Sequence, residues 1–220
     1  MKLALFDFCE TLVDFQTADR YVEFALKNLT PRPHYYYSKV LSFLQHKGII
    51  WRVSKIFPTA SLNKRLVLRQ LNGISESKLK QLAKDYYELE LKPHFITKTI
   101  EELKIRQEKG YRIVLLSGGY DIYLKCFAED FGIAEEDIIS TKIKFNRGCC
   151  TGSFEGIDCQ WEHKIELLNR CFKRDTLESV AYSDSKSDIP MLSWANEGIV
   201  IRRKGAPKWD MNNQFNEIIW

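Results

Sequence analysis

Hydrophobic residues change their spacing along the chain, and each change predicts a different kind of element. A short apolar run over Lys2–Phe8 is typical of a strand that is buried on both faces. From about residue 15 to residue 109, apolar side chains recur every three or four positions, as at Leu79, Leu82 and Tyr86. This spacing predicts amphipathic helices.

After residue 109 the pattern alternates between strand-like and helical segments. Strands are expected over Tyr111–Leu116, Asp137–Ile143, Val180–Ser183 and Gly198–Ile201, helices over Asp121–Phe131, Glu162–Phe172 and Asp188–Trp194, and a turn or hairpin over Arg147–Gly156. Such alternation predicts an α/β fold with a Rossmann-like parallel sheet and helices on both faces. The tail Trp209–Trp220 has no clear period, and we expect it to cover an edge of the sheet.

The distribution of charge separates the helical block from the rest. The chain has 220 residues, of which 45% are apolar and 28% charged, a balance typical of a folded domain. Residues 15–110 contain 18 Lys/Arg and 9 Asp/Glu, whereas the remainder contains 15 and 20. One continuous domain is not expected to segregate charge in this way. We therefore predict a catalytic body over 1–14 and 110–220, with an inserted all-helical cap over 15–109.

Other features of the composition bear on location. No window of ~18 uninterrupted apolar residues exists, so no transmembrane helix is expected. The start of the chain, MKLALFDFCETLVDF, lacks the small-residue cleavage site of a signal peptide. We expect a cytoplasmic protein, and we expect its six cysteines to be free, buried thiols.

Groups with suggestive chemistry lie where predicted strands end or helices begin. Asp7 ends the first predicted strand, Ser117-Gly118-Gly119 follows the second, Lys164 opens a helix, and Asp184 and Asp188 follow a later strand. In a parallel sheet, ligands bind at the carboxyl ends of the strands. These groups are therefore expected to meet at one edge.

Together these groups match the requirements of phosphoryl transfer through an aspartyl intermediate. A carboxylate attacks phosphorus, and a divalent cation must offset the repulsion between two anions. Asp184 and Asp188 are suitable oxygen donors for Mg²⁺. A hydroxyl and exposed backbone amides, as at Ser117 and Gly118, can bind phosphate oxygens, and a lysine can neutralise developing charge.

The segments FDFCETLV, IVLLSGGYDIYL, the Lys of WEHK, and VAYSDSKSDIPML resemble the four motifs of the haloacid dehalogenase-like hydrolase superfamily, in its phosphoserine-phosphatase-like branch. The resemblance covers about 125 residues of the body. It implies that Asp7 is the nucleophile. It also implies that Asp7, Asp184 and the backbone carbonyl of Cys9 bind Mg²⁺, and that Asp188 completes or orders the metal shell.

The resemblance further implies that Ser117 and the Gly118 amide hold phosphate, and that Lys164 secures both Asp7 and the phosphate. Thr11 would brace the loop, and Ser187 stands where relatives often carry Asn. Because the family places substrate selectivity in the cap and in the loop after the first motif, weak candidates for substrate contacts follow from position alone: Gln16, Thr17, Asp19 and Arg20.

Cys9 departs from the family pattern, because family phosphatases carry there an Asp that acts as general acid and then general base. A thiol with an ordinary pKa near ~8.5 is mostly protonated at neutral pH. It can donate a proton but is poorly suited to activate water, and loss of such a catalyst typically costs about 10²–10⁴-fold in rate. Two hypotheses stay open: a phosphatase with reduced turnover, and a metal- and phosphate-binding regulatory protein with little or none.

The partners follow from the same resemblance. We predict an Mg²⁺-dependent phosphatase of a small phosphorylated metabolite, with monomer and homodimer both open. The pair Gln16–Thr17 contains no acidic residue to bind an amino group, which weakens phosphoserine itself as the substrate. The basic, aromatic-rich cap has three interpretations: a helical core with solvated cations, which is favoured, attraction of an anionic substrate, and a surface for nucleic acid or an anionic membrane, which is least favoured.

Overall fold

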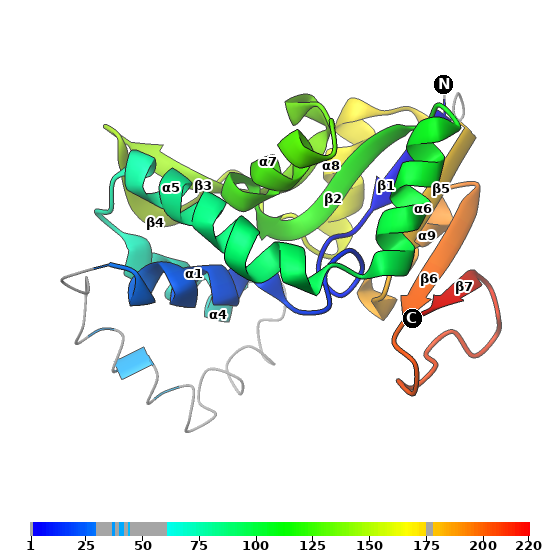
Figure 1. The fold of residues 1–220 in the computed structure, drawn as a ribbon, viewed down its shortest axis with the longest axis horizontal. Helices are drawn as coiled ribbons and strands as arrows, with labels where there is room; N and C mark the ends of the chain where they lie inside the picture. Colours follow the sequence, from blue (N-terminus) through cyan, green and yellow to red (C-terminus); the bar gives the residue numbers. More distant parts are fainter. Residues whose placement is uncertain (1, 30–36, 38–39, 42–43, 45–60, 175–177) are drawn as a thin grey trace.

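A computed structural model of the chain describes residues 2–29, 37, 40–41, 44, 61–174 and 178–220 (Figure 1). A seven-stranded sheet with the order β4-β3-β2-β1-β5-β6-β7 forms its centre. The strands are β1 (Lys2–Phe6), β2 (Arg112–Tyr120), β3 (Ile138–Asn146), β4 (Cys149–Glu155), β5 (Glu178–Ser183), β6 (Glu197–Arg202) and β7 (Asn216–Ile219). Neighbouring strands are parallel except for β3 and β4, which form an antiparallel hairpin.

Helices pack on both faces of this sheet, as predicted. The longer helices are α1 (Thr17–Lys27), α4 (Leu62–Leu68), α5 (Glu76–Tyr86), α6 (Thr97–Glu108), α7 (Asp121–Asp130), α8 (Glu162–Cys171) and α9 (Ile189–Trp194). Short 3₁₀ turns are η2 (Arg69–Leu71), η4 (Lys92–His94), η5 (Glu135–Asp137) and η7 (Lys186–Asp188), and η3 (Tyr87–Leu91) is a π-helical turn.

The apolar run of β1 explains the two cores. Ala4 and Phe6 belong to a cluster shared with α6 and α7, whereas Leu3 and Leu5 belong to a second cluster shared with α8 and α9. All four side chains are fully buried, because successive side chains of a central strand point to opposite faces, and both faces are covered. The predicted α/β architecture is confirmed.

Several element bounds differ from the prediction. β1 ends at Phe6, before the loop that contains Asp7. β2 runs through the predicted Ser-Gly-Gly turn to Tyr120, with a shift in its register against β3 after Ser117. The predicted last strand is followed by β7, which extends the sheet beside β6. The ambiguous tail therefore does cover an edge, and it does so by adding a parallel strand.

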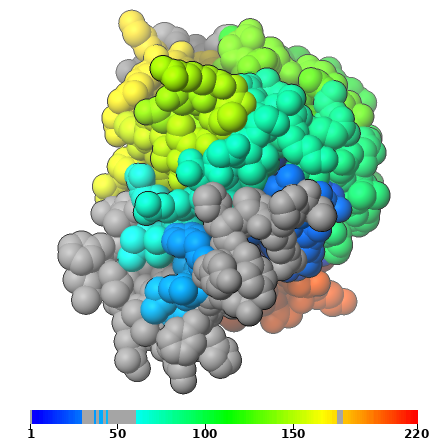
Figure 2. All heavy atoms as spheres, turned by 90° about the vertical axis from the view of Figure 1, so that its left-hand side faces the viewer, coloured from blue at the N-terminus to red at the C-terminus, as the bar shows by residue number. Residues whose placement is uncertain are grey.

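The predicted insertion contains α1, α4, α5 and α6. In Figure 1, α1, α4 and α5 lie on the left, beside the β3–β4 hairpin, and Figure 2 shows this face of the molecule. Helix α6 instead packs against β2, and its Arg106 donates a hydrogen bond of 2.6 Å to the hydroxyl of Tyr182 in β5. The domain boundary at residue 109 stays a prediction. Its position depends on whether α6, which packs against the sheet, is counted with the cap or with the body.

The structure also bears on two predictions from the sequence, the absence of a membrane-spanning helix and the state of the cysteines. In the part of the chain that the structure describes, no helix is long and apolar enough to cross a membrane. All six cysteines are free thiols, as expected, but only Cys150 and Cys159 are buried. The expectation that all of them are buried is wrong, because Cys149 and Cys171 lie at the exposed ends of surface elements.

Candidate active site

The predicted chemical groups converge at the carboxyl ends of the central strands. Asp7 follows β1, Ser117 lies near the end of β2, Asp184 follows β5, and Lys164 lies in the first turn of α8. They border a cavity of about 200 Å³, whose lining is Asp7, Cys9, Gln16, Ala18, Ser117, Gly118, Gln160, Trp161, Lys164, Asp184, Ser185, Ser187 and Asp188. The cavity therefore lies at the edge of the sheet where the sequence predicts that these groups meet.

Lys164 binds two carboxylates at once. Its Nζ donates to Asp7 Oδ1 at 2.8 Å and to Asp188 Oδ2 at 2.6 Å. Burial alone would lower the pKa of Lys164, but Asp7 and Asp188 raise it above its ordinary value, so the ammonium stays charged. Ser183 also donates to Asp188 Oδ2, at 2.7 Å, and this contact orients Asp188 toward Lys164.

Thr11 joins the loop after β1 to the loop after β5. Its hydroxyl lies 3.5 Å from Asp7 Oδ2 and 3.3 Å from Asp184 Oδ1, and it accepts a hydrogen bond of 3.1 Å from the Asp184 amide. Two carboxylate oxygens therefore face the same hydroxyl. Thr11 braces the loops as predicted.

These carboxylates form a donor set that fits Mg²⁺. Asp7 and Asp188 share the Lys164 ammonium, and Asp184 adds a third carboxyl group to the same cavity lining. Burial, with Asp7 and Glu10 adding to it, raises the pKa of Asp184 to about 8. Among the described residues no three His, Cys, Asp or Glu side chains gather closely enough to hold a metal ion by themselves. Mg²⁺ tolerates such a set, because it usually keeps several waters and takes only one or two carboxylates.

The predicted phosphate-binding groups, Ser117 and Gly118, line the same cavity. Ser117 Oγ accepts a hydrogen bond of 3.1 Å from the Gly119 amide, which leaves the hydroxyl proton free to donate into the cavity. An added Cβ at Gly118 would lie 2.8 Å from Cγ of Gln160, so the Gln160 side chain would have to shift to admit any larger residue.

Cys9 is turned toward the first helix of the insertion. Its Sγ lies 3.1 Å from Thr17 Oγ1, which in turn lies 2.6 Å from the hydroxyl of Tyr123. Burial, with the Asp7 charge next in importance, raises the pKa of the Cys9 thiol to about 11. The thiol therefore stays protonated at neutral pH and is held by a hydroxyl chain.

The four weak candidates for substrate contacts are not all brought to the cavity. Gln16 lines it and donates to Glu10 Oε2 at 2.6 Å. Thr17 is buried behind Cys9, Asp19 accepts from Asn63 at 3.0 Å, and Arg20 stacks on the ring of Phe15. Those three side chains lie outside the cavity lining, so a direct substrate contact stays an untested prediction.

Some residues at the site were missed from the sequence. Gln160 and Trp161 line the cavity just before Lys164, and Trp161 has a φ of 50°, a strained conformation for a residue with a side chain. The indole of Trp209, in the tail, donates to the backbone oxygen of Asp184 at 2.7 Å. Because Trp161 lies three residues before Lys164, its place at the site could have been predicted from the sequence. Nothing in the sequence pattern linked Trp209 to Asp184.

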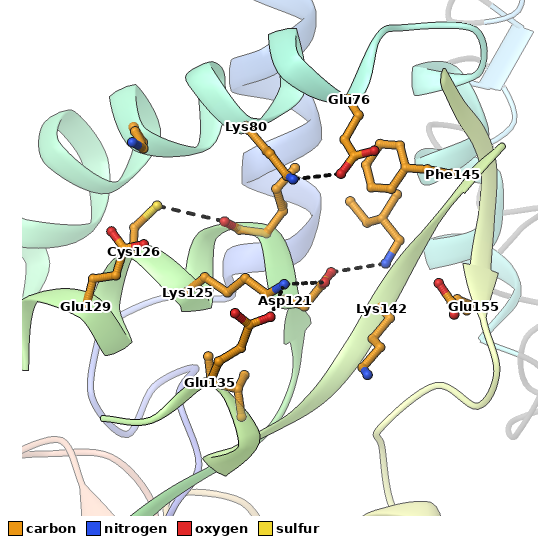
Figure 3. A pocket seen from close by; sticks show the side chains of 14 residues that line it. Glu76, Lys80, Asp121, Lys125, Cys126, Glu129, Glu135, Lys142, Phe145 and Glu155 are labelled. Carbon is orange, nitrogen blue, oxygen red and sulfur yellow. Dashed lines mark hydrogen bonds and ion pairs between the residues drawn. The ribbon is translucent and has the colours of Figure 1, made fainter. Parts of the chain in front are cut away.

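A larger cavity of about 560 Å³ lies away from this site, between α5, α7 and the β3–β4 hairpin (Figure 3). Its lining mixes lysines with carboxylates, and the pairs Lys80–Glu76 and Lys125–Glu135 are already formed at 2.7 and 2.6 Å. Despite its size, this cavity has no concentration of one charge and no buried nucleophile. We therefore take the smaller cavity as the candidate active site.

Comparisons with known proteins agree with this geometry. The family model of haloacid dehalogenase-like hydrolases matches residues 4–193. The phosphoserine phosphatase of Methanocaldococcus jannaschii is 27% identical over 198 residues, covering 88% of this chain and 82% of that protein.

Solved structures show the same fold. A protein of unknown function from Bordetella pertussis Tohama I has a TM-score of 0.79 at 20% identity, covering 99% of this chain and 97% of that one. A phosphoserine phosphohydrolase-like protein from Francisella tularensis has a TM-score of 0.62 at 20% identity, covering 91% and 87%. The resemblance drawn from the four motifs is thus confirmed, and the chain belongs to the haloacid dehalogenase-like hydrolase family.

Proposed function

We propose that this chain is an Mg²⁺-dependent phosphatase of small phosphorylated metabolites that acts through an aspartyl phosphate on Asp7. The observation that carries the proposal is the buried ion-paired group in the lining of the cavity, where Lys164 joins Asp7 to Asp188. Ser117 and Gly118 border the same cavity. The similarity to a protein named phosphoserine phosphatase supports this reaction class.

In the proposed reaction, a carboxylate oxygen of Asp7 attacks phosphorus, and the bond from phosphorus to the leaving oxygen breaks. Lys164, Ser117 and the Gly118 amide bind the other phosphate oxygens and stabilise the charge that develops there. Water then attacks the phosphorus of the aspartyl phosphate, which releases inorganic phosphate and regenerates Asp7. Asp7, Asp184 and the Cys9 carbonyl, with Asp188 completing or ordering the set, would hold Mg²⁺, which would supply positive charge to offset the repulsion between carboxylate and phosphate.

Cys9 affects the two halves of this reaction differently. Its thiol can donate a proton to the departing alkoxide, which then leaves as an alcohol. The resulting thiolate regains a proton from solvent before hydrolysis, because its raised pKa favours the thiol at neutral pH. The reprotonated thiol is a poor base for the attacking water. The proposed enzyme is therefore expected to form the aspartyl phosphate more readily than it hydrolyses it, and to prefer acyl, aryl or pyrophosphate leaving groups.

A panel of phosphoserine, aryl phosphates, acyl phosphates and pyrophosphate tests the proposal, by measuring phosphate release with and without Mg²⁺. We expect Mg²⁺-dependent release from at least one substrate, and none from Asp7→Asn. The matched control Asp130→Asn changes a surface carboxylate and is expected to retain activity. If no substrate turns over and no beryllium fluoride complex forms at Asp7, the proposal is wrong.

The hydrogen bond between Cys9 and Thr17 favours one second candidate, a regulatory protein that binds metal and phosphate without turnover. Cys9→Asp separates the two. A rise in phosphate release by about 10²–10⁴-fold from an activity near zero supports the regulatory role, whereas a small change supports the phosphatase.

A further inference from the structure

A cation from the insertion reaches into the body of the protein beside the active site. Lys64 lies in α4, and its Nζ has three acceptors from separate segments. It donates to Gly118 O at 2.5 Å, to Thr141 Oγ1 at 2.9 Å and to Asp158 Oδ1 at 2.5 Å. Lys64 is not among the residues that line the cavity, so this contact lies behind the cavity wall.

The side chain of Lys64 is almost completely shielded from solvent. The Lys64 and Asp158 side chains are only 8% and 4% exposed, and the rings of Tyr120 and Phe154 each lie 5.2 Å from the ammonium nitrogen. Few lysines are buried to this degree unless they are paired. Such a pair is weak evidence for stability, because desolvation offsets much of the attraction. A contribution to stability therefore does not by itself explain why Lys64 and Asp158 are paired here.

The first consequence of this contact concerns the phosphate-binding turn. Gly118 O is held by Lys64, and the amide of the same peptide, on Gly119, is held by Ser117 Oγ at 3.1 Å. The peptide between the two glycines is thus fixed at both ends. Without side chains, two successive glycines can rotate more freely than other residues. The contact with Lys64 therefore limits the direction in which Gly118 presents its own amide.

The second consequence concerns the segment that leads to α8. The backbone oxygen of Asp158 accepts from the Gln160 amide at 2.8 Å and lies 3.2 Å from His163 Nδ1. The first turn of α8, which contains Lys164, begins directly after this segment. Lys64 is consequently bonded to both structures that carry the predicted phosphate ligands.

We propose that Lys64 is a positioning residue that couples docking of α4 to phosphate affinity, by fixing the Gly118–Gly119 peptide and the segment before α8. This inference rests on the proposed function, because the phosphate ligands are those of the proposed reaction. Lys64 acts through Gly118 and Asp158 and does not touch the phosphate.

The test compares Lys64→Met with a matched control, Lys80→Met, which removes an exposed lysine from the same insertion. Binding of inorganic phosphate in the presence of Mg²⁺ is measured by calorimetry, with KM and kcat for a turned-over substrate. We expect Lys64→Met to weaken phosphate binding about tenfold, the loss that corresponds to one hydrogen bond to a charged group. Lys80→Met is expected to bind phosphate as the wild type does.

Lys64→Met leaves Asp158 buried without its ion-pair partner, with Thr141 as its remaining donor. Because this variant can fail to fold, a second variant is needed. Lys64→Met/Asp158→Leu removes both charges and is expected to restore the thermal midpoint, yet still to bind phosphate about tenfold more weakly. A merely structural role predicts wild-type phosphate affinity and KM in this double variant. That result would overturn the proposal.

Amide hydrogen exchange separates this inference from the proposed function, because it requires no activity. We expect residues 115–121 to exchange faster in the double variant than in the wild type, while exchange in β5 stays unchanged. Unchanged exchange over 115–121 overturns the coupling even if the wild type is an active phosphatase. If the wild type binds no phosphate, the proposed function is wrong, and the proposed effect of Lys64 on phosphate affinity is wrong as well.

Discussion

Lys164 holds together the carboxylates on which the proposed chemistry depends. Its ammonium contacts Asp7 and Asp188 at 2.8 and 2.6 Å, and all three side chains are buried. Removing the cation leaves two carboxylates close together in a medium that solvates them poorly. Lys164 is therefore expected to contribute to folding as well as to phosphate binding.

Lys164→Met is expected to lower the free energy of unfolding by about 3–5 kcal/mol, because it leaves buried charges uncompensated, and to abolish phosphate release. Urea unfolding followed by tryptophan fluorescence measures the first effect. Arg170→Met is the control on the same helix: its ion pair with Glu166 is exposed, so a change within about 0.5 kcal/mol is expected. A Lys164→Met protein as stable as the wild type would contradict this account.

At the scale of elements, the segment between β4 and α8 is attached to the sheet by Asp158 and Cys159. The Cys159 amide donates to Thr141 Oγ1 at 3.1 Å, and its Sγ contacts the backbone oxygen of Ile139 at 3.4 Å. The thiol is fully buried in the cluster that α8 and α9 share with the sheet. This attachment places α8, and with it Lys164, at the edge where β1 and β2 end.

Burial raises the pKa of Cys159 from 9.0 to about 12, and a pH dependence of stability follows. Above pH 9 the unfolded chain loses this proton while the folded chain keeps it, so stability falls as pH rises toward 12. Cys159 is expected to contribute a loss of about 1 kcal/mol between pH 9 and pH 10.

Urea unfolding at pH 8, 9 and 10 measures this dependence. Cys159→Ala lowers stability at every pH through the lost packing, but its stability is expected to fall less steeply over the same range. Equal slopes in the wild type and the variant would show that Cys159 does not titrate as described.

At the scale of the whole molecule, the segment that contains Trp209 and β7 packs beside the site to which the loop after β1 contributes. Strand β7 extends the sheet beside β6, and the preceding loop brings Trp209 to the backbone of Asp184. Asp210 anchors that loop by accepting from the amides of Gln214 and Phe215. The position of one proposed metal ligand thus depends on a segment 25 residues away.

Trp209→Phe keeps an aromatic ring but removes the N–H that binds Asp184. We expect the Mg²⁺ concentration for half-maximal activity to rise several-fold, because one hydrogen bond is worth about 1 kcal/mol. Trp220→Phe is the matched control, since the buried Trp220 Nε1 has no partner among the described residues. Mg²⁺ titration of phosphate release measures both variants, and an equal response would contradict the role given to Trp209.

Much of this molecule could be predicted from the sequence, because the signals are local. Buried strands, amphipathic helices and glycines that end helices leave periodic or positional marks, as at Gly132, where φ is 62°. The motifs around Asp7, Ser117, Lys164 and Asp184 could be placed at one edge because parallel strands end there together.

The sequence by itself therefore determined the class of fold, the family and the edge of the sheet at which the candidate site lies. Only the tertiary structure decided that β7 extends the sheet, that Lys64 holds Gly118, that Trp209 holds Asp184, and that Cys9 bonds Thr17. Two of these four contacts, those of Lys64 and Trp209, join residues 25 or more positions apart. Strand β7 pairs with β6 across an irregular loop, and the contact of Cys9 depends on how a loop meets a helix. Side-chain pairing of this kind has no period along the chain, because it is set by where the packed elements come to lie.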